Sequence, residues 1–425
     1  MTIDRPAGSE IRHSRTPVHQ LTLGFIPLVD CAPLVVAAEM GFAAAENLGL
    51  NLVRETSWAN IRDRVMLGHF HAAHMLGPMP IASTLGLGSA LDAPMVAPFS
   101  FGLGGNAITV STALFAEMQA RGVDGSSGPA AVAAALADVV ARRRAAGAPP
   151  LAVAMVFPFS GHNYELRYWL ASAGIDPDRD IRLGVLPPPF MVDAMAEGRV
   201  DAFCVGEPWN SLAVDRGVGV IVATKSALWR QGPEKVLGLR ADFADANREA
   251  LFALLRALYR AAAWAGDSHN REALAALLAR PGYVGGSPEI VARALAGTIL
   301  RGAGRGPETI PDFLVFHDHA ANFPWQSHAL WFYSQMVRWG QTPFSPADAQ
   351  RARQVYRPDL YRAALATTEA DLPSASAKVE GALTQATPVA SRNGRMVLGP
   401  DGFFDGLLFD PDDLEGYLVR LRNMG

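Results

Sequence analysis

Short strand-like segments alternate with helix-like segments over the first part of the chain. In order they are residues 21–25 (strand), 32–48 (helix), 50–55 (strand), 59–67 (helix) and 72–76 (strand). Pro78 then stands where the next helix would begin, a position that suits proline. Because parallel strands need long connections, usually helices, this alternation predicts a parallel sheet covered by helices.

A second alternating series follows residues 113–150, where we expect two surface helices joined by a Gly/Ser turn. Its elements are residues 152–157 (strand), 162–172 (helix), 181–186 (strand), 190–197 (helix), 201–205 (strand), a helix after Pro208 and a strand over 217–223. Residues 247–263 carry four leucines on one stripe, which indicates an amphipathic helix. The chain has 425 residues, too many for one compact core, so we predict an α/β protein with two lobes.

The two predicted lobes are not both continuous in the chain. We expect residues 19–105 and 208–310 to form the first lobe, and residues 106–207 to form the second. Residues 1–18 are expected to be a disordered arm. Residues 311–425 are irregular and rich in aromatic residues, and we expect them to form a C-terminal extension that wraps the lobes.

Composition and termini narrow the classes of function. The 41 acidic residues outnumber the 37 basic ones, which argues against a nucleic-acid surface. Cys31 and Cys204 lie far apart, and we expect two buried thiols and no disulfide. The first twenty residues contain no apolar run, and polar residues interrupt the long uncharged stretch at 93–116. We therefore expect no secretory signal, no transmembrane helix and a cytoplasmic location.

No motif of the sequence indicates catalysis. A strand would place His69 and His71 on one face and His74 on the other, which is unsuitable for a metal with three histidine ligands. The glycine run at 101–106 lacks the nucleotide-binding patterns, and no nucleophile motif is present. We expect no metal, no cofactor and no enzyme activity. The glycine run suits a turn whose backbone N–H groups approach a small anion.

Polar, proline and aromatic residues follow several of the predicted strands or occupy nearby loops. These residues are Trp58, Asn106, His162, Pro188, Glu207 and Lys235. In open α/β sheets, ligands bind beyond the carboxyl ends of the strands. We therefore predict that these residues converge on one ligand site, with Lys235 in a loop.

Short phrases around these residues resemble the nitrate- and bicarbonate-binding proteins of cyanobacterial-type ABC transporters. The matching phrases are SW at 57–58, RD at 62–63, HMLGPMP at 74–80, GNAITV at 105–110, RYWL at 167–170 with His162 ahead of it, GIDP at 174–177, PPP at 187–189, DAFCVGEPWN at 201–210 and PEK at 233–235. The long phrase at 201–210 is the most specific. The resemblance covers about residues 21 to 287 and implies a type II periplasmic-binding-protein fold, in which two βαβ lobes close around an anion in a central cleft.

The resemblance also implies a set of ligand-binding residues. Trp58, His162 and Lys235 match a tryptophan, a histidine and a lysine that meet nitrate in this family. Gly102 and Asn106 match a glycine and a glutamine, and the asparagine is a departure from the family pattern.

Three further residues, Pro188, Val205 and Glu207, are expected to line the same cleft by analogy. A carboxylate beside an anion is repulsive. We therefore expect Glu207 to pair with Lys235 or to accept a hydrogen bond behind the ligand.

Three functions are compatible with the resemblance. The lack of a signal favours a branch similar to the cytoplasmic nitrate/nitrite sensors of assimilation operons (the NasS type). Such a sensor sequesters an ANTAR-domain RNA-binding antiterminator and releases it when the anion binds, and this is the function we expect. The alternatives are a periplasmic receptor of an ABC transporter for nitrate, bicarbonate or a sulfonate, and an enzyme such as a pyrimidine-precursor synthase. We expect no direct binding of nucleic acid or membrane.

Overall fold

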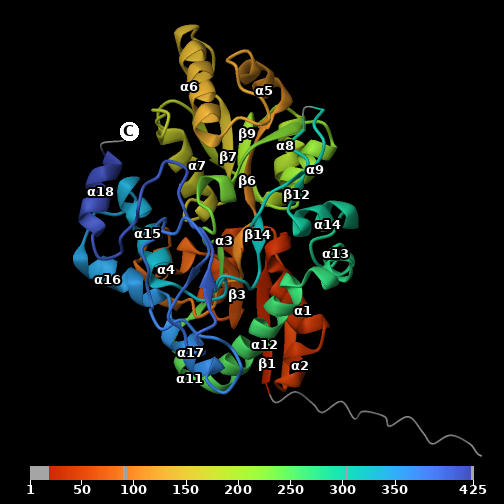
Figure 1. The fold of residues 1–425 in the computed structure, drawn as a ribbon, viewed down its shortest axis with the longest axis vertical. Helices are drawn as coiled ribbons and strands as arrows, with labels where there is room; N and C mark the ends of the chain where they lie inside the picture. The colour runs from red at the N-terminus through yellow and green to blue at the C-terminus, as the bar shows by residue number, and fades with distance from the viewer. Residues whose placement is uncertain (1–18, 90, 92, 303, 423–425) are drawn as a thin grey trace, which may run out of the picture.

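The computed structural model describes residues 19–89, 91, 93–302 and 304–422. The disordered arm expected at residues 1–18 lies outside the described residues. Two five-stranded sheets form the centres of two lobes, the first in the lower half of Figure 1 and the second in the upper half. This arrangement agrees with the predicted two-lobed α/β architecture.

The first sheet has the strand order β2-β1-β3-β11-β4. Its strands are β1 (His19–Phe25), β2 (Leu48–Arg54), β3 (Ala72–Leu76), β4 (Met95–Val96) and β11 (Lys235–Arg240). β1 is parallel to β2 and β3, whereas β11 is antiparallel to β3 and β4. The prediction of a purely parallel sheet is therefore wrong. β11 is the first strand after the chain returns from the second lobe, so no crossover helix of its own lobe sets its direction.

The first lobe surrounds this sheet with helices. They are η1 (Val29–Cys31), α1 (Ala32–Glu39), α2 (Phe42–Ala45), α3 (Trp58–Met66), α4 (Pro78–Thr84), α11 (Ala241–Ala246), α12 (Arg248–Gly266), η3 (Ser268–Asn270), α13 (Arg271–Leu278) and α14 (Pro288–Ala296). The single helix expected over 32–48 is instead two, because Gly41 adopts a φ of 80° between them. The amphipathic helix expected over 247–263 is confirmed as α12, whose leucine stripe is buried and which packs against α1.

The second sheet has the strand order β10-β6-β9-β7-β8. Its strands are β6 (Asn106–Ser111), β7 (Ala152–Met155), β8 (Arg182–Val185), β9 (Ala202–Gly206) and β10 (Gly219–Thr224). β7 is parallel to β8 and β9, but β6 is antiparallel to β9 and β10. We expected residues 208–310 in the first lobe. β10 instead completes the pairing of β6, so the second lobe continues to about residue 228.

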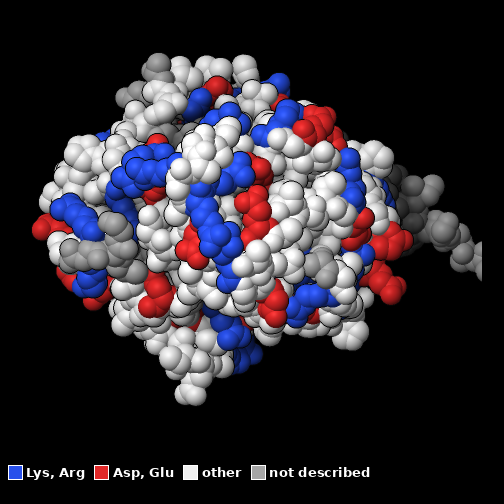
Figure 2. Space-filling view, turned by 90° about the horizontal axis from the view of Figure 1, so that it is seen from above, with Lys and Arg blue, Asp and Glu red and all other residues white. Residues whose placement is uncertain are grey.

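The helices of the second lobe are α5 (Thr112–Gln119), α6 (Pro129–Ala145), α7 (Gly161–Ala171), η2 (Pro188–Phe190), α8 (Met191–Ala196), α9 (Trp209–Asp215) and α10 (Lys225–Leu228). α5 and α6 are the expected pair of surface helices, at the top of Figure 1. Figure 2 views the molecule from above and shows acidic side chains beside the basic ones over this face. Arg143 and Arg144 of α6 accordingly approach Glu117 and Asp180.

The C-terminal part contacts both lobes, and it contains helices where we expected irregular structure. Its elements are β14 (Leu314–Val315), α15 (Gln326–Arg338), α16 (Pro346–Val355), α17 (Pro358–Leu365), β15 (Thr387–Pro388), β16 (Val397–Leu398) and α18 (Leu414–Arg422). β14 pairs with β5 (Leu103–Gly104), and just before this part β12 (Thr298–Ile299) pairs with β13 (Glu308–Thr309). α17 packs on α12 of the first lobe. The Tyr164 hydroxyl of α7 donates a hydrogen bond to Gln341 at 2.6 Å, which ties this part to the second lobe.

Two further predictions concern the cysteines and the membrane. Cys31 and Cys204 are both free and buried, which confirms two thiols and no disulfide between them. Among the described residues, no helix combines the length and apolar character that crossing a membrane requires.

Candidate functional site

Lys235 opens β11 and lies opposite Leu76 of β3. Its side chain is buried, and its Nζ donates hydrogen bonds of 2.8 Å to Asp30 and 2.8 Å to Glu234. Burial alone would lower the pKa of Lys235, but the two carboxylates outweigh burial and raise it, so the ammonium stays charged. The predicted loop position of Lys235 is wrong, because the residue begins a strand that pairs on both sides.

Asp30 lies in η1, just after β1, and joins Lys235 to His74 of β3. One of its oxygens is 3.0 Å from His74 Nε2. Burial alone would raise the pKa of Asp30, but Lys235 and His74 outweigh burial and lower it to about 2. Burial lowers the pKa of His74, so its ring is neutral at pH 7. Within the described part of the chain, no three His, Cys, Asp or Glu side chains are grouped as metal ligands.

Trp58 begins α3, directly after the extended residue Ser57. Its indole ring is buried, with Lys235 Nζ 5.7 Å and the His74 ring 5.8 Å from its centre. An ammonium near an indole face is attracted by the ring's electrons. Three sequence segments of the first lobe therefore surround one buried positive charge.

The second lobe contributes His162 and Glu165 from the start of α7. The Ser160 hydroxyl accepts a hydrogen bond from the Asn163 N–H and caps the helix there. Residues three apart on a helix share a face, so His162 and Glu165 both point toward Glu234. His162 Nδ1 lies 3.3 Å from Glu234 Oε1. Burial lowers the pKa of His162 to about 3, so its ring is neutral at pH 7.

A second buried lysine, Lys225 of α10, completes the cluster. Its Nζ contacts Glu165, lies 2.9 Å from Glu234 Oε2 and donates to the Pro233 carbonyl at 2.6 Å. Glu234 thus bridges Lys225 and Lys235. On the far side of Glu165, Asn106 Nδ2 donates a hydrogen bond of 3.3 Å to the carboxylate.

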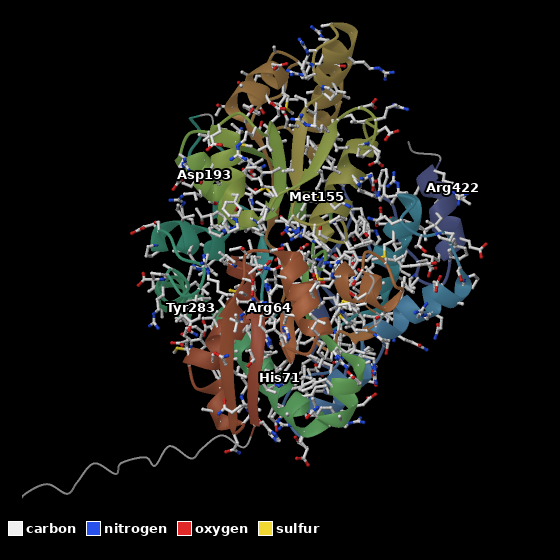
Figure 3. The ribbon with its side chains drawn as sticks, turned by 180° about the vertical axis from the view of Figure 1, so that it is seen from behind. Arg64, His71, Met155, Asp193, Tyr283 and Arg422 are labelled. Atoms are coloured by element: carbon white, nitrogen blue, oxygen red, sulfur yellow. The ribbon has the colours of Figure 1, made fainter. Side chains whose placement is uncertain are left out.

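The resulting group, which we call the central cluster, joins both lobes. Its members are Asp30, Trp58, His74, Asn106, His162, Glu165, Lys225, Glu234 and Lys235, none more than 6% exposed. Figure 3, in which Met155 marks the upper lobe and Arg64 the lower, shows side chains filling the space between the sheets. The residues expected along a cleft are therefore enclosed.

Several polar atoms of the central cluster have no hydrogen-bond partner within the described part of the chain. They include Trp58 Nε1, His162 Nε2 and Asn106 Oδ1. A buried polar group without a partner costs about 1–3 kcal/mol, so proteins rarely retain one without a use. Trp58 and His162 lie near the buried ammonium of Lys235, and a small anion with several acceptor oxygens would satisfy their N–H groups. Asn106 Oδ1 is itself an acceptor and needs a donor.

The glycines of the run at 101–106 lie against the C-terminal part of the chain. A side chain at Gly102 would collide with the Val315 carbonyl of the β14 strand at 2.5 Å. The Gly105 N–H donates to the Phe313 carbonyl at 2.6 Å, so the prediction that it meets an anion is wrong. These glycines allow β5 to lie against the C-terminal part of the chain.

Glu207, Pro188 and Val205 lie outside the polar contacts of the central cluster. Glu207 accepts a hydrogen bond of 3.2 Å from the Ser211 N–H. It does not pair with Lys235, the other role we expected, because Lys235 pairs with Asp30 and Glu234. Burial raises the pKa of Glu207 to about 7. Pro188 begins η2 and is buried, and Val205 belongs to the same apolar core as Trp58.

Sequence analysis missed the counter-ions Asp30, Glu165, Lys225 and Glu234. Two signals were present. Glu165 stands one helical turn after His162, and Glu234 directly precedes Lys235. Asp30 and Lys225 each follow a strand, but so do many polar residues, so their position alone does not identify them.

Comparison with known sequences gives three findings. A model of the NMT1-like family matches residues 14–279. The nitrate/nitrite binding protein NrtA of Synechococcus elongatus is 35% identical, over 95% of this chain and 86% of that one. The nitrate import ATP-binding protein NrtC of Synechocystis is 37% identical over 94% of this chain, and the match spans 55% of that relative's length.

The crystal structure of the periplasmic nitrate-binding protein NrtA from Synechocystis matches the whole architecture. The TM-score is 0.83 at 30% identity, and the match covers 95% of this chain and 98% of that one. The expected periplasmic-binding-protein fold is therefore confirmed, with mixed in place of parallel sheets.

Proposed function

The chain belongs to the NMT1-like family, among the NrtA-type substrate-binding proteins, and we propose that it traps nitrate or nitrite without changing it chemically. The observation that carries the proposal is the set of buried, unpaired polar atoms of Trp58 and His162 beside Lys235. The relatives are named for transport and binding, not for catalysis, which supports a binding role.

The chemistry of the central cluster suits a small planar monoanion. Nitrate carries one charge spread over three oxygens, so removing it from water costs less than removing a divalent anion such as sulfate. Lys235 supplies a compact positive charge, and the Trp58 N–H is a donor for one oxygen. His162 is a second donor when a proton is on Nε2.

We also propose the role of a receptor for an ABC transporter, because the named relatives are binding and ATP-binding components of such transporters. The sequence favoured a cytoplasmic sensor that sequesters an ANTAR-domain antiterminator. The relatives support the receptor more than the sensor, and the sensor and its location stay predictions. Affinity purification of the full chain from its native cells distinguishes them: permease components support the receptor, and a soluble RNA-binding partner released by nitrate supports the sensor.

Calorimetric titration with nitrate, nitrite, bicarbonate and sulfate tests the ligand. We expect binding of nitrate or nitrite, with a rise in the free energy of unfolding of about 2.7 kcal/mol at a hundredfold excess over Kd. In His162→Ala, the affinity should fall by about 1–3 kcal/mol, because an acceptor oxygen loses its donor. Unchanged melting curves with both nitrate and nitrite at millimolar concentration contradict the proposal.

A further inference from the structure

Glu165 lies between a lysine and an amide. Lys225 Nζ contacts one carboxylate oxygen, and Asn106 Nδ2 donates to the other at 3.3 Å. Glu234 approaches from the segment before β11, and the Cys204 thiol from β9. His162 shares the face of α7 on which Glu165 lies. Asn106 Oδ1, on the same amide, has no hydrogen-bond partner within the described residues although it is fully buried.

While Glu165 is ionised, the net charge of the central cluster opposes the entry of an anion. With Asp30, Glu234 and Glu165 ionised, three negative charges face the two positive charges of Lys225 and Lys235, and both histidines are neutral. A bound anion would bring a fourth negative charge into an enclosed site. Uncompensated buried charge is strongly unfavourable, so the charge of the cluster has to change when the anion enters.

We propose that the anion enters together with one proton from solvent, that Glu165 carries this proton, and that Asn106 turns its amide toward the anion as a result. This inference rests on the proposed function and specifies how that same site is regulated. The proton forms an O–H bond on the Glu165 carboxylate, and no other covalent bond changes.

The amide of Asn106 links the proton to the anion. Against an ionised Glu165, the amide must present its N–H, as it does in this structure. A protonated Glu165 is a donor, so the amide is favoured to turn by half a rotation and accept through Oδ1, the atom now without a partner. The Nδ2 hydrogens then point away from Glu165 and are available to the anion. Asn106 stands where the family resemblance places a glutamine, so this coupling would be a property of the present chain.

The environment of Glu165 supports this assignment. Burial raises the pKa of Glu165 to about 7, against the attraction of Lys225. The carboxyl therefore gains or loses its proton near neutrality. Asp30 is different, because its lowered pKa keeps it ionised.

Calorimetric titration of the full chain with sodium nitrate in two buffers of different ionisation enthalpy counts the protons taken up. We expect close to one proton per nitrate at about pH 8.5 and close to none at about pH 5.5, with Kd rising about tenfold per pH unit above pH 7. Glu165→Gln imitates the protonated carboxyl, since its amide donates to Asn106. It should take up no proton and should bind at pH 8.5 about as tightly as the parent does at pH 5.5.

Glu207→Gln is the matched control, because Glu207 is a buried carboxyl with a similarly raised pKa that contacts Ser211 in place of the central cluster. It should keep the proton uptake. Uptake that persists in Glu165→Gln assigns the proton to another group, such as His162, and overturns the proposal. Nitrate binding by the parent without uptake and without a change of Kd with pH also overturns it, whether or not the variant folds. A parent that binds no nitrate at any pH overturns the proposed function as well.

Discussion

Two ion networks in this molecule, one around Lys378 and the other the central cluster, consist of the same residue types but differ in how completely their polar atoms are paired. In the C-terminal part, Lys378 contacts Glu380 and lies 2.5 Å from Asp401. The remaining carboxylate oxygens accept hydrogen bonds from the Ser327 hydroxyl at 2.6 Å and the Leu383 N–H at 2.8 Å. Every carboxylate oxygen of this extension network is therefore paired.

The central cluster is built differently. Its members come from both lobes, and two lysines share the Glu234 carboxylate. Donors and acceptors of Trp58, His162 and Asn106 stay unpaired. The comparison indicates that a network whose carboxylate oxygens are all paired within the chain holds structure together, whereas one with unpaired donors and acceptors beside its charges retains the capacity to bind.

Of the substitutions that test this comparison, Lys235→Ala is expected to have the largest effect on nitrate affinity and stability. Nitrate affinity should fall by about 2–4 kcal/mol, the scale for losing one partner of a desolvated charge pair. The free energy of unfolding should fall as well, by about 3–5 kcal/mol, because Asp30 and Glu234 keep buried charges without their partner. Calorimetric titration and denaturant unfolding measure the two effects. Parent-like nitrate affinity in this variant would place the site elsewhere.

Lys378→Ala separates stability from binding. Its free energy of unfolding should also fall by about 3–5 kcal/mol, since the buried Glu380 and Asp401 lose their partly buried counter-ion. Nitrate affinity, measured at a temperature where the variant is folded, should match that of the parent. A loss of affinity as large as that of Lys235→Ala would show that the two networks do not have separate roles.

The pH dependence of stability distinguishes a carboxyl whose pKa is raised on folding from one whose pKa is lowered. Burial raises the pKa of Glu207 from 4.5 to about 7, so the folded chain holds that proton more tightly than the unfolded chain. The stabilisation is complete below pH 4.5 and is lost as the pH rises through 7, amounting to about 3 kcal/mol at most. Glu207→Gln should remove the part of the decline due to Glu207 and leave the part due to Glu165, as measured by urea unfolding between pH 4.5 and 8.

The contribution of Glu380 to stability changes with pH in the opposite direction. Burial alone would raise its pKa, but Lys378 and His328 outweigh burial and lower it to about 2. Its stabilisation is therefore present above pH 4.5 and is lost as the pH falls toward 2. Glu380→Gln should leave the decline between pH 4.5 and 8 in place. If both variants change the stability over the same pH range, then the assignment of the alkaline decline to Glu207 and of the acid decline to Glu380 is wrong.

The sequence predicted most strands of both lobes from their local periods, but it did not predict β4, β6 or β11. β6 and β11 each follow a crossing between the lobes, so no helix of their own sheet fixes their direction, and both run antiparallel to their neighbours. The sequence also did not place the return to the first lobe, because β10 pairs with a strand more than a hundred residues earlier.

The site was predictable in part for a similar reason. Trp58, His162 and Lys235 were found from the motifs around them, and the structure brings them together. Their counter-ions are set by contacts between distant segments, such as Asp30 with Lys235, and no local pattern encodes such a pair. Gly102 matched its motif, but its position is explained by the backbone that lies against it.

The smallest effect is expected from removing a single indole N–H. Among the described residues near the two networks, two tryptophans carry a buried indole N–H without a hydrogen-bond partner, which allows a matched test. Trp58 lies beside Lys235, whereas Trp229 stacks on Phe403 with ring centres 4.6 Å apart. Trp58→Phe keeps an aromatic ring near Lys235 but removes the N–H. Nitrate affinity should therefore fall by about 1 kcal/mol, roughly fivefold, as expected for one lost hydrogen bond. Trp229→Phe removes the same group outside the central cluster and should leave the affinity unchanged. Equal affinities for both variants would mean that an unpaired N–H in this fold does not mark the ligand, and that Trp58 only shapes the site.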